Sequence, residues 1–293
     1  MNSLHQQASA AAHRLRTAGI PPAEADLDAR LLACEVLGWD TATYLTSSGE
    51  IPGADFNERY DALVSRREAR EPMAYILGSQ EFWGRLFKVT PAVLIPRPET
   101  ELIVETALEL FPDRQAALSM ADIGTGSGCL AVTLAAEFPN AAIIATDVSG
   151  PALAVAEHNA RRLNVADRIS FAQADVLAVS STTFDLIVSN PPYVRDTDRQ
   201  TLPPEVILHE PASSLFGGAD GLSILRRVAH DAVRRLKPSG FLLVEFGLGQ
   251  ADQIQELISA TAGLTMVALK RDLQGIPRTA VARATGPRMN LVS

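Results

Sequence analysis

The sequence predicts an α/β protein in which a small helical bundle precedes a parallel sheet flanked by helices. Three observations predict this fold class. Apolar residues recur at helical spacing through residues 1–70, short apolar runs alternate with helical segments after Pro112, and a glycine-rich turn joins the first of these runs to the helix that follows it. Strands that alternate with helices along a chain form βαβ units, whose strands lie parallel in one sheet.

Length and composition limit the class of molecule. The chain has 293 residues, of which 47% are hydrophobic, enough for one large and one small domain. A formal net charge of -8 argues against a broad nucleic-acid surface, because phosphate binding relies on clustered cations. The two cysteines, Cys34 and Cys129, indicate a reducing compartment without disulfides, and the scattered histidines predict no metal site. The polar N-terminus has no signal-peptide core and no apolar run approaches the ~20 residues that span a bilayer, so we expect a cytoplasmic protein that contacts no membrane.

Residues 1–75 predict a helical bundle, because leucines and valines recur at helical spacing between turns marked by glycine. Acidic residues outnumber basic ones there, so this bundle is a poor candidate for gripping DNA. It either recognises a protein substrate or only packs on the rest of the chain. Residues 76–95 predict a β-hairpin linker with its turn at Gly84, and the domain that carries the sheet then spans residues 96–293.

That domain begins with an extended segment, Pro96-Arg97-Pro98, and a helix that has Glu99 and Glu101 in its first turn. Arg97 and Glu99 either face a ligand or only begin the helix, and the sequence leaves both interpretations open. The next expected elements are a strand at 118–123, a helix at 129–138, a strand at 141–146, a helix at 151–163, and strands at 169–172 and 186–189. A long polar loop at 195–218, expected to be a lid or binding surface, precedes a helix at 222–236, a strand at 241–246, a helix at 251–262 and strands at 264–269 and 280–284.

The turn after the strand at 186–189 predicts a site for a planar –NH2 group. Asn190 is followed by Pro191 and Pro192, and prolines have no N–H, so this turn presents carbonyl oxygens and very few donors. The Asn190 side chain adds an oxygen, and the Tyr193 ring supplies a flat wall. An amide or an exocyclic base amine would donate both of its hydrogens to such a turn, which lies where open α/β sheets bind ligands.

A second group of strand ends predicts a nucleoside cofactor. Glycines 124, 126 and 128 lie between the first strand and its helix, where backbone passes close to a ligand. Their spacing departs from G-x-G-x-x-G, which disfavours a dinucleotide. Asp147 ends the second strand, where an acid typically holds ribose hydroxyls. Asp175 and Val176 follow the third strand and offer an acid for the edge and an apolar residue for the face of an adenine. S-adenosylmethionine fits this set, because no phosphate-gripping lysine motif accompanies it.

Six segments spread over nearly the whole chain match one known family: Pro72–Gly78, Glu81–Gly84, Leu94–Glu101, Asp122–Gly128, Ser189–Tyr193 and Leu215–Gly221. With its helical N-terminal region, the chain resembles the release factor glutamine methyltransferases, which are protein-(glutamine-N5) methyltransferases. The resemblance implies a seven-stranded, Rossmann-like class I methyltransferase fold and S-adenosylmethionine as cofactor. It implies as substrate the glutamine of the Gly-Gly-Gln motif of peptide chain release factors, methylated on its amide nitrogen. We expect a monomer without direct nucleic-acid contact.

The resemblance also assigns roles to residues. The methionine part of the cofactor falls to Gly124, Thr125, Gly126, Ser127 and Gly128, the ribose to Asp147, the adenine to Asp175 and Val176, and the substrate glutamine to Asn190, Pro191, Pro192 and Tyr193. Asn190 and Pro191 are the expected catalytic residues, and Asn190 also borders the cofactor. Two positions depart from the family. Val176 stands where some relatives have an aromatic residue, and Ile276-Pro277 precedes Arg278 where polar residues are expected.

Three other functions remain as alternatives. An adenine-N6 methyltransferase acting on DNA or RNA would use the same –NH2 site, but the negative charge and the lack of a separate basic domain disfavour it. A NAD-dependent oxidoreductase is disfavoured by the glycine spacing. A binding protein that keeps a cofactor pocket and docks on the translation machinery is disfavoured by the intact Asn190 and the unbroken glycine loop.

Overall fold

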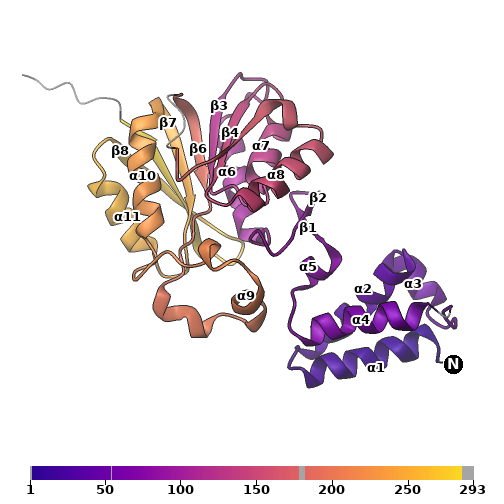
Figure 1. Cartoon of the computed structure of the whole chain (residues 1–293). Helices are drawn as coiled ribbons and strands as arrows, with labels where there is room; N and C mark the ends of the chain where they lie inside the picture. Colours follow the sequence, from indigo (N-terminus) through magenta and orange to yellow (C-terminus); the bar gives the residue numbers. More distant parts are fainter. Residues whose placement is uncertain (1, 54, 178–181, 286–293) are drawn as a thin grey trace, which may run out of the picture. The chain divides into compact units, whose positions relative to one another are not determined.

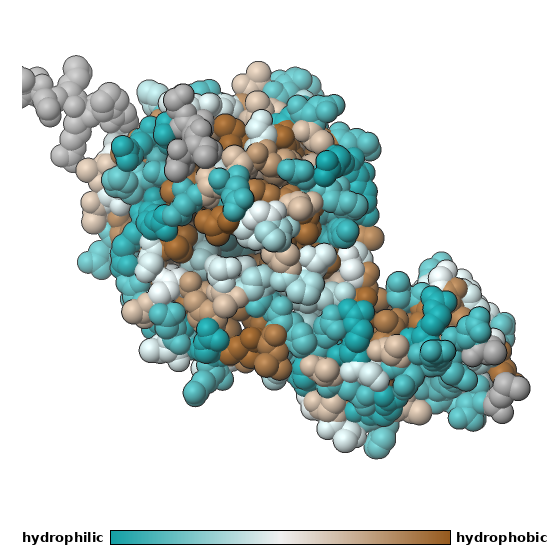
Figure 2. Space-filling model, in the orientation of Figure 1, coloured by the Kyte–Doolittle hydropathy of each residue, from teal (hydrophilic) through white to brown (hydrophobic). Residues whose placement is uncertain are grey.

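The structure is a computed structural model that describes residues 2–53, 55–177 and 182–285. The chain forms two compact units. The first comprises residues 1–79 and 202–209, and the second comprises residues 80–201 and 210–293. The face drawn in Figure 2 is hydrophilic over most of its area and carries separate, small hydrophobic patches.

The first unit is helical (Figure 1). Its helices are α1 (Leu4–Thr17), α2 (Pro22–Leu37), α3 (Thr41–Ser47), α4 (Phe56–Glu68), α5 (Met73–Leu77) and α9 (Pro204–His209). Leu15, Leu32 and Val64 are fully buried between α1, α2 and α4. The buried Arg67 donates to Asp28 at 2.8 Å and forms an ion pair with Glu205 at 3.1 Å, so α9 is tied to this unit although it follows far along the chain.

The second unit contains a seven-stranded sheet in the order β5-β4-β3-β6-β7-β9-β8. The strands are β3 (Ser119–Ile123), β4 (Ala142–Asp147), β5 (Ile169–Gln173), β6 (Phe184–Ser189), β7 (Leu236–Glu245), β8 (Leu264–Arg271) and β9 (Pro277–Ala284). β9 runs antiparallel to its neighbours β7 and β8, and the remaining pairs are parallel. Strands β1 (Ser79–Phe82) and β2 (Arg85–Lys88) form a separate two-stranded sheet. The predicted fold class is confirmed.

Helices cover both faces of this sheet (Figure 1). They are η1 (Pro98–Thr100), α6 (Glu101–Leu110), α7 (Cys129–Glu137), α8 (Gly150–Arg162), α10 (Ser223–Arg235) and α11 (Ala251–Ala260). Leu186 and Val188 of β6 lie in the core with α6 and α7, whereas Ile187 between them lies in the core with α10 and α11. Successive side chains of a strand point to opposite faces, so the uninterrupted apolar run of β6 reflects burial on both sides.

The order of the strands locates the crevice of the sheet. After β3 the chain moves to β4 and β5 on one side, and then crosses to β6 on the other side of β3. Ligands of open α/β sheets bind outside the carboxyl ends of the strands at such a reversal. Ile123 and Ser189 are paired in register, and the Ser189 hydroxyl donates to the Ile123 carbonyl at 2.8 Å. The turns that follow β3 and β6 therefore start side by side.

Two sequence predictions differ from the structure. β7 begins at Leu236, directly after α10, whereas the strand was expected to begin only at residue 241. Residues 237–240 contain proline and glycine, which are typical of turns, but an irregularity in the β6–β7 pairing accommodates them. The loop expected at 195–218 contains three short helices, namely η3 (Asp196–Thr201), α9 and η4 (Ala212–Ser214).

Candidate functional site

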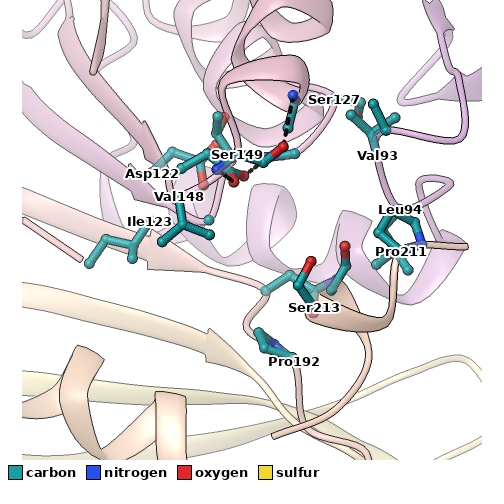
Figure 3. Close-up of a pocket in the computed structure, with 18 of the residues that line it drawn as sticks. Val93, Leu94, Asp122, Ile123, Ser127, Val148, Ser149, Pro192, Pro211 and Ser213 are labelled. Atoms are coloured by element: carbon teal, nitrogen blue, oxygen red, sulfur yellow. Dashed lines mark hydrogen bonds between the residues drawn. The ribbon is translucent and has the colours of Figure 1, made fainter. Parts of the chain in front are cut away.

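A cavity of about 670 Å³ opens at the carboxyl ends of β3, β4, β5 and β6 (Figure 3). Figure 3 shows Ile123 and Val148 on one side of it and Val93, Leu94 and Pro211 on the other. The predicted site residues that line it are Gly124, Thr125, Gly126, Ser127, Asp147, Asp175, Val176, Asn190 and Pro192. The three others, Gly128, Pro191 and Tyr193, belong to the same turns but are outside its lining.

Gly128 has a structural reason to be glycine. It precedes α7 with a φ of 81°, in the left-handed region that side chains disfavour. A Cβ at this position would lie 3.0 Å from the Cβ and 3.1 Å from the Cα of Ala156 in α8. The close approach of α7 to α8 therefore depends on it. A Cβ on Gly124, in contrast, would meet no atom within 4 Å.

The buried carboxylate of Asp122 holds the glycine loop in place through hydrogen bonds. Its Oδ2 accepts from the Thr125 hydroxyl at 2.6 Å and from the Ala131 backbone N–H at 3.1 Å, which fixes the loop to the start of α7. Its Oδ1 is buried and has no hydrogen-bond partner among the described residues. Burial raises the pKa of the Asp122 carboxyl to about 7. Asp122 is among the residues that line the cavity, although its Oδ1 is not exposed to solvent.

Asp147, at the end of β4, closes the neighbouring side of the cavity. Its Oδ2 accepts from the Gly126 N–H and its Oδ1 from the Ser149 N–H, both at 2.9 Å. These two bonds orient the carboxylate and couple it to the glycine loop. Each carboxylate oxygen has a second lone pair, so both can accept further hydrogen bonds from a ligand hydroxyl.

The rim beyond β5 carries an ion pair that the sequence did not predict. Asp175 pairs with Arg227 of α10, and both side chains are about half exposed where they border the cavity. Val176 has a φ of 51°, which is unusual for a β-branched residue. Such strained backbone persists only where surrounding structure holds it, and it occurs often at ligand sites. Nothing in the sequence around Arg227 separates it from the other arginines of its helix.

Asn190 is held by a chain of hydrogen bonds that reaches into the core. Its Nδ2 donates to Thr100 Oγ1 at 2.9 Å, and Thr100 Oγ1 lies 2.6 Å from Glu245 Oε2. The Tyr193 hydroxyl donates to Glu245 Oε1 at 3.1 Å. Glu245 is 1% exposed, and burial raises the pKa of its carboxyl to about 7. Among the described residues none donates to the Asn190 Oδ1 or to the Pro191 carbonyl.

The glycine-rich segment at 215–221 holds this turn in place. The Val194 N–H donates to the Leu215 carbonyl and the Gly217 N–H donates to the Val194 carbonyl, both at 2.9 Å. A Cβ on Gly221 would lie 2.2 Å from the Tyr193 carbonyl oxygen, so only glycine fits there. The Gln250 side-chain amide donates to the same carbonyl at 3.0 Å. The Asn-Pro-Pro-Tyr turn is thus fixed from two sides.

Arg97 has a structural partner. It pairs with Glu210, whose side chain is 1% exposed and also accepts from the Ile95 N–H at 3.1 Å. Glu210 immediately precedes Pro211, and the next residues bring Ser213 and Ser214 to the cavity wall. The ion pair therefore anchors the segment that closes one side of the cavity.

Besides Arg227, sequence reasoning missed Thr100, Glu245 and Gln250. Thr100 belongs to the Leu94–Glu101 segment, but it is distant along the chain from Asn190. Glu245 follows the apolar run of β7 just as Asp147 follows that of β4, so the rule that strand ends carry ligand residues was available for it. Within the described parts of the chain, no group of three His, Cys, Asp or Glu side chains could hold a metal ion, and no helix is long and apolar enough to cross a membrane.

Known sequences match the chain in both of its units. The family described as PrmC N-terminal domain matches residues 8–78, and the methyltransferase small domain matches residues 100–220. A release factor glutamine methyltransferase of Bradyrhizobium diazoefficiens is 42% identical over 278 residues, which are 94% of this chain and 93% of that protein. One from Koribacter versatilis is 41% identical over 283 residues, or 96% of this chain and 98% of the relative.

Solved structures match at the level of the fold. A methyltransferase from Pyrococcus furiosus superposes with a TM-score of 0.52 at 20% identity and covers 79% of this chain and 99% of its own. The catalytic domain of hMettl16, solved with an RNA hairpin, gives a TM-score of 0.53 at 17% identity and covers 78% of this chain and 93% of its own. Such low identity supports a shared fold and carries no argument about substrate.

Proposed function

The chain belongs to the release factor glutamine methyltransferase family, and from that membership we propose that it methylates the side-chain amide nitrogen, N5, of the glutamine in the Gly-Gly-Gln motif of peptide chain release factors. The proposed methyl donor is S-adenosylmethionine. The observation that carries the proposal is the acceptor character of the Asn190 turn. Asn190, whose amide oxygen receives no hydrogen bond from the described residues, lines the cavity that the glycine loop borders, and Pro191 with its free carbonyl follows it in the same turn.

The cavity suits the proposed donor in size and charge. Its volume of about 670 Å³ is within the range of ~300–1,000 Å³ typical of small-molecule sites. The Asp147 carboxylate, which the Gly126 and Ser149 N–H groups orient, suits a ribose diol. We assign Gly124–Ser127 to the methionine part and Asp175 with Val176 to the adenine. Val148, which is 57% exposed beside Asp147, adds an apolar wall.

Orientation is the main contribution that we propose for the protein. An amide nitrogen is a poor nucleophile, because its lone pair is delocalised into the carbonyl. Bound S-adenosylmethionine would supply an electrophilic methyl group on a sulfonium. Asn190 Oδ1 and the Pro191 carbonyl would accept the two amide hydrogens of the substrate and aim its nitrogen at that methyl group.

The same two oxygens would lower the barrier electrostatically. Positive charge would develop on the amide nitrogen as it gained the methyl group that the sulfonium lost, and the two preorganised acceptors would favour that charge. The extra proton then leaves to water, which restores a neutral amide. The scheme requires no histidine or cysteine at the reacting atoms.

The turn alone would also accept the exocyclic amine of adenine. Family membership and the net charge of -8 favour the glutamine. We propose that the helical unit, which corresponds to the predicted bundle at 1–75, recognises the release factor. Transfer of radiolabelled methyl to a purified release factor, beside a version without its Gly-Gly-Gln glutamine and beside unmethylated DNA, tests the proposal. Labelling of the intact factor alone supports it, and labelling of DNA contradicts it.

A further inference from the structure

We infer that Thr100 and Glu245 are positioning residues that set the orientation of the Asn190 side-chain amide, so that its oxygen faces the cavity. The inference rests on the proposed function, because it explains how one acceptor of the same site is selected. The oxygen and nitrogen of an asparagine amide have nearly the same shape. Packing alone therefore does not determine whether the oxygen or the nitrogen faces a substrate –NH2 group. A hydrogen-bond partner of the amide has to determine it.

The hydrogen available to each group in the chain of hydrogen bonds determines the orientation of the Asn190 amide. A threonine hydroxyl has one hydrogen to donate and lone pairs to accept. When the Glu245 carboxyl group is ionised, the Thr100 hydroxyl donates this hydrogen to Glu245 Oε2, which is 2.6 Å from Thr100 Oγ1. Thr100 can then only accept from Asn190, 2.9 Å away, which requires Nδ2 on that side. Oδ1 is consequently directed to the cavity.

Tyr193 favours the same orientation of the Asn190 amide, because it bonds to the other carboxylate oxygen of Glu245. Its hydroxyl donates to Glu245 Oε1 at 3.1 Å. With both oxygens accepting, the buried carboxylate has a donor for each and no need of a proton of its own. Two residues of the turn, Asn190 and Tyr193, thereby connect it to Glu245, Asn190 through Thr100 and Tyr193 directly.

Protonation of Glu245 would undo the selection. A proton on Oε2 would be donated to Thr100, whose own hydrogen would then be donated to Asn190 and would favour the flipped amide. The flipped amide offers two N–H groups to a substrate –NH2, so one acceptor is replaced by a donor. Burial raises the pKa of Glu245, the hydrogen bonds from Thr100 and Tyr193 lower it, Glu99 raises it and Arg278 lowers it, and the net result is a pKa of about 7. Burial raises the pKa of the half-buried Cys129 thiol, and the charges of Asp122 and Glu245 add to this rise.

Thr100→Val is the direct test, because it removes the hydroxyl and keeps the shape. Thr106→Val is the matched control. Thr106 lies in α6, which begins directly after Thr100, and it is equally buried at 1% exposed. Its hydroxyl donates to the Leu102 carbonyl. We expect Thr100→Val to lower kcat on the order of 10²-fold, the scale of one lost transition-state partner. The cofactor Kd should change less than about threefold, and Thr100→Ser should restore most of the loss.

The pH profile separates orientation from a merely structural role. The wild-type kcat should fall as the pH drops through the pKa of Glu245, because the ionised form is the one that orients Asn190. Glu245→Gln should lose this low-pH limb, since nothing titrates at that position. A limb that persists in Glu245→Gln would instead belong to another acid, such as Asp122, and would overturn the inference even if Thr100→Val failed to fold.

The outcomes distinguish the inference from the function on which it rests. A wild-type enzyme that labels no release factor refutes the proposed function. A wild-type enzyme that labels it, with Thr100→Val as active as Thr106→Val, refutes only the role of Thr100 and Glu245. Loss of activity in Thr100→Val and in Thr100→Ser alike would also overturn the inference, because a retained hydroxyl should suffice.

Discussion

Replacing Gly128 by alanine should destabilise the sheet unit far more than replacing Gly124. Both glycines have positive φ, 81° and 71°, and a side chain in that region costs about 1–2 kcal/mol. The Cβ of Gly128→Ala would also meet Ala156 at 3.0 Å, where overpacking adds about 1–3 kcal/mol. The expected losses of unfolding free energy are therefore about 2–5 kcal/mol for Gly128→Ala and about 1–2 kcal/mol for Gly124→Ala.

Thermal unfolding without ligand measures this difference. At about 2–4 °C per kcal/mol for a unit of this size, Gly128→Ala should lower Tm by roughly 4–20 °C and Gly124→Ala by roughly 2–8 °C. The ligand effect should follow the opposite order: Gly124→Ala should weaken S-adenosylmethionine binding in isothermal titration more than Gly128→Ala does in the protein that remains folded. Equal Tm losses for the two variants would refute the claim that Gly128 serves the packing of α7 on α8.

Three further predictions concern the cavity. Asn190→Ala should lower kcat by about 10²–10³-fold with little change in the S-adenosylmethionine Kd, because it removes an acceptor used in methyl transfer. Single-turnover kinetics and a binding titration check this prediction. An equal loss of kcat and of cofactor affinity would argue against it. Asp147→Ala should raise the cofactor Kd by roughly tenfold or more, the scale of one charge-assisted hydrogen bond, and an unchanged Kd would remove Asp147 from the ribose role. Asp122 has its pKa raised to about 7 in the folded state, so the folded protein binds the extra proton and loses stability as the pH rises from the unfolded pKa of about 4 toward 7. Relative to Asp122→Asn, the wild type should become less stable over this interval in urea unfolding, and a constant difference would contradict the shift.

The features that the sequence predicted lie at the ends of strands. The glycine loop, Asp147 and the Asn190 turn each follow an apolar run directly, and the carboxyl ends of parallel strands meet at one edge. Their proximity therefore follows from local patterns once the sheet is predicted.

The residues that sequence reasoning missed act through long-range contacts. Thr100 reaches Asn190 from a segment 90 positions earlier in the chain, and Thr100 and Glu245 meet across 145 positions. No local pattern encodes such pairs. Residues 237–240, which lie between the expected helix and the expected strand, instead fall within β7, but they have no partner in the pairing with β6, where Leu236 pairs with Phe184 and Phe241 with Leu186.

Methyl transfer from S-adenosylmethionine to a purified release factor tests the central claim most directly. We expect label on the intact factor, none on the factor whose Gly-Gly-Gln glutamine is replaced, and none on unmethylated DNA. Equal labelling of the intact and replaced factors would contradict the assignment of that glutamine. Label on DNA would mean that the Asn190 turn accepts an adenine amine instead.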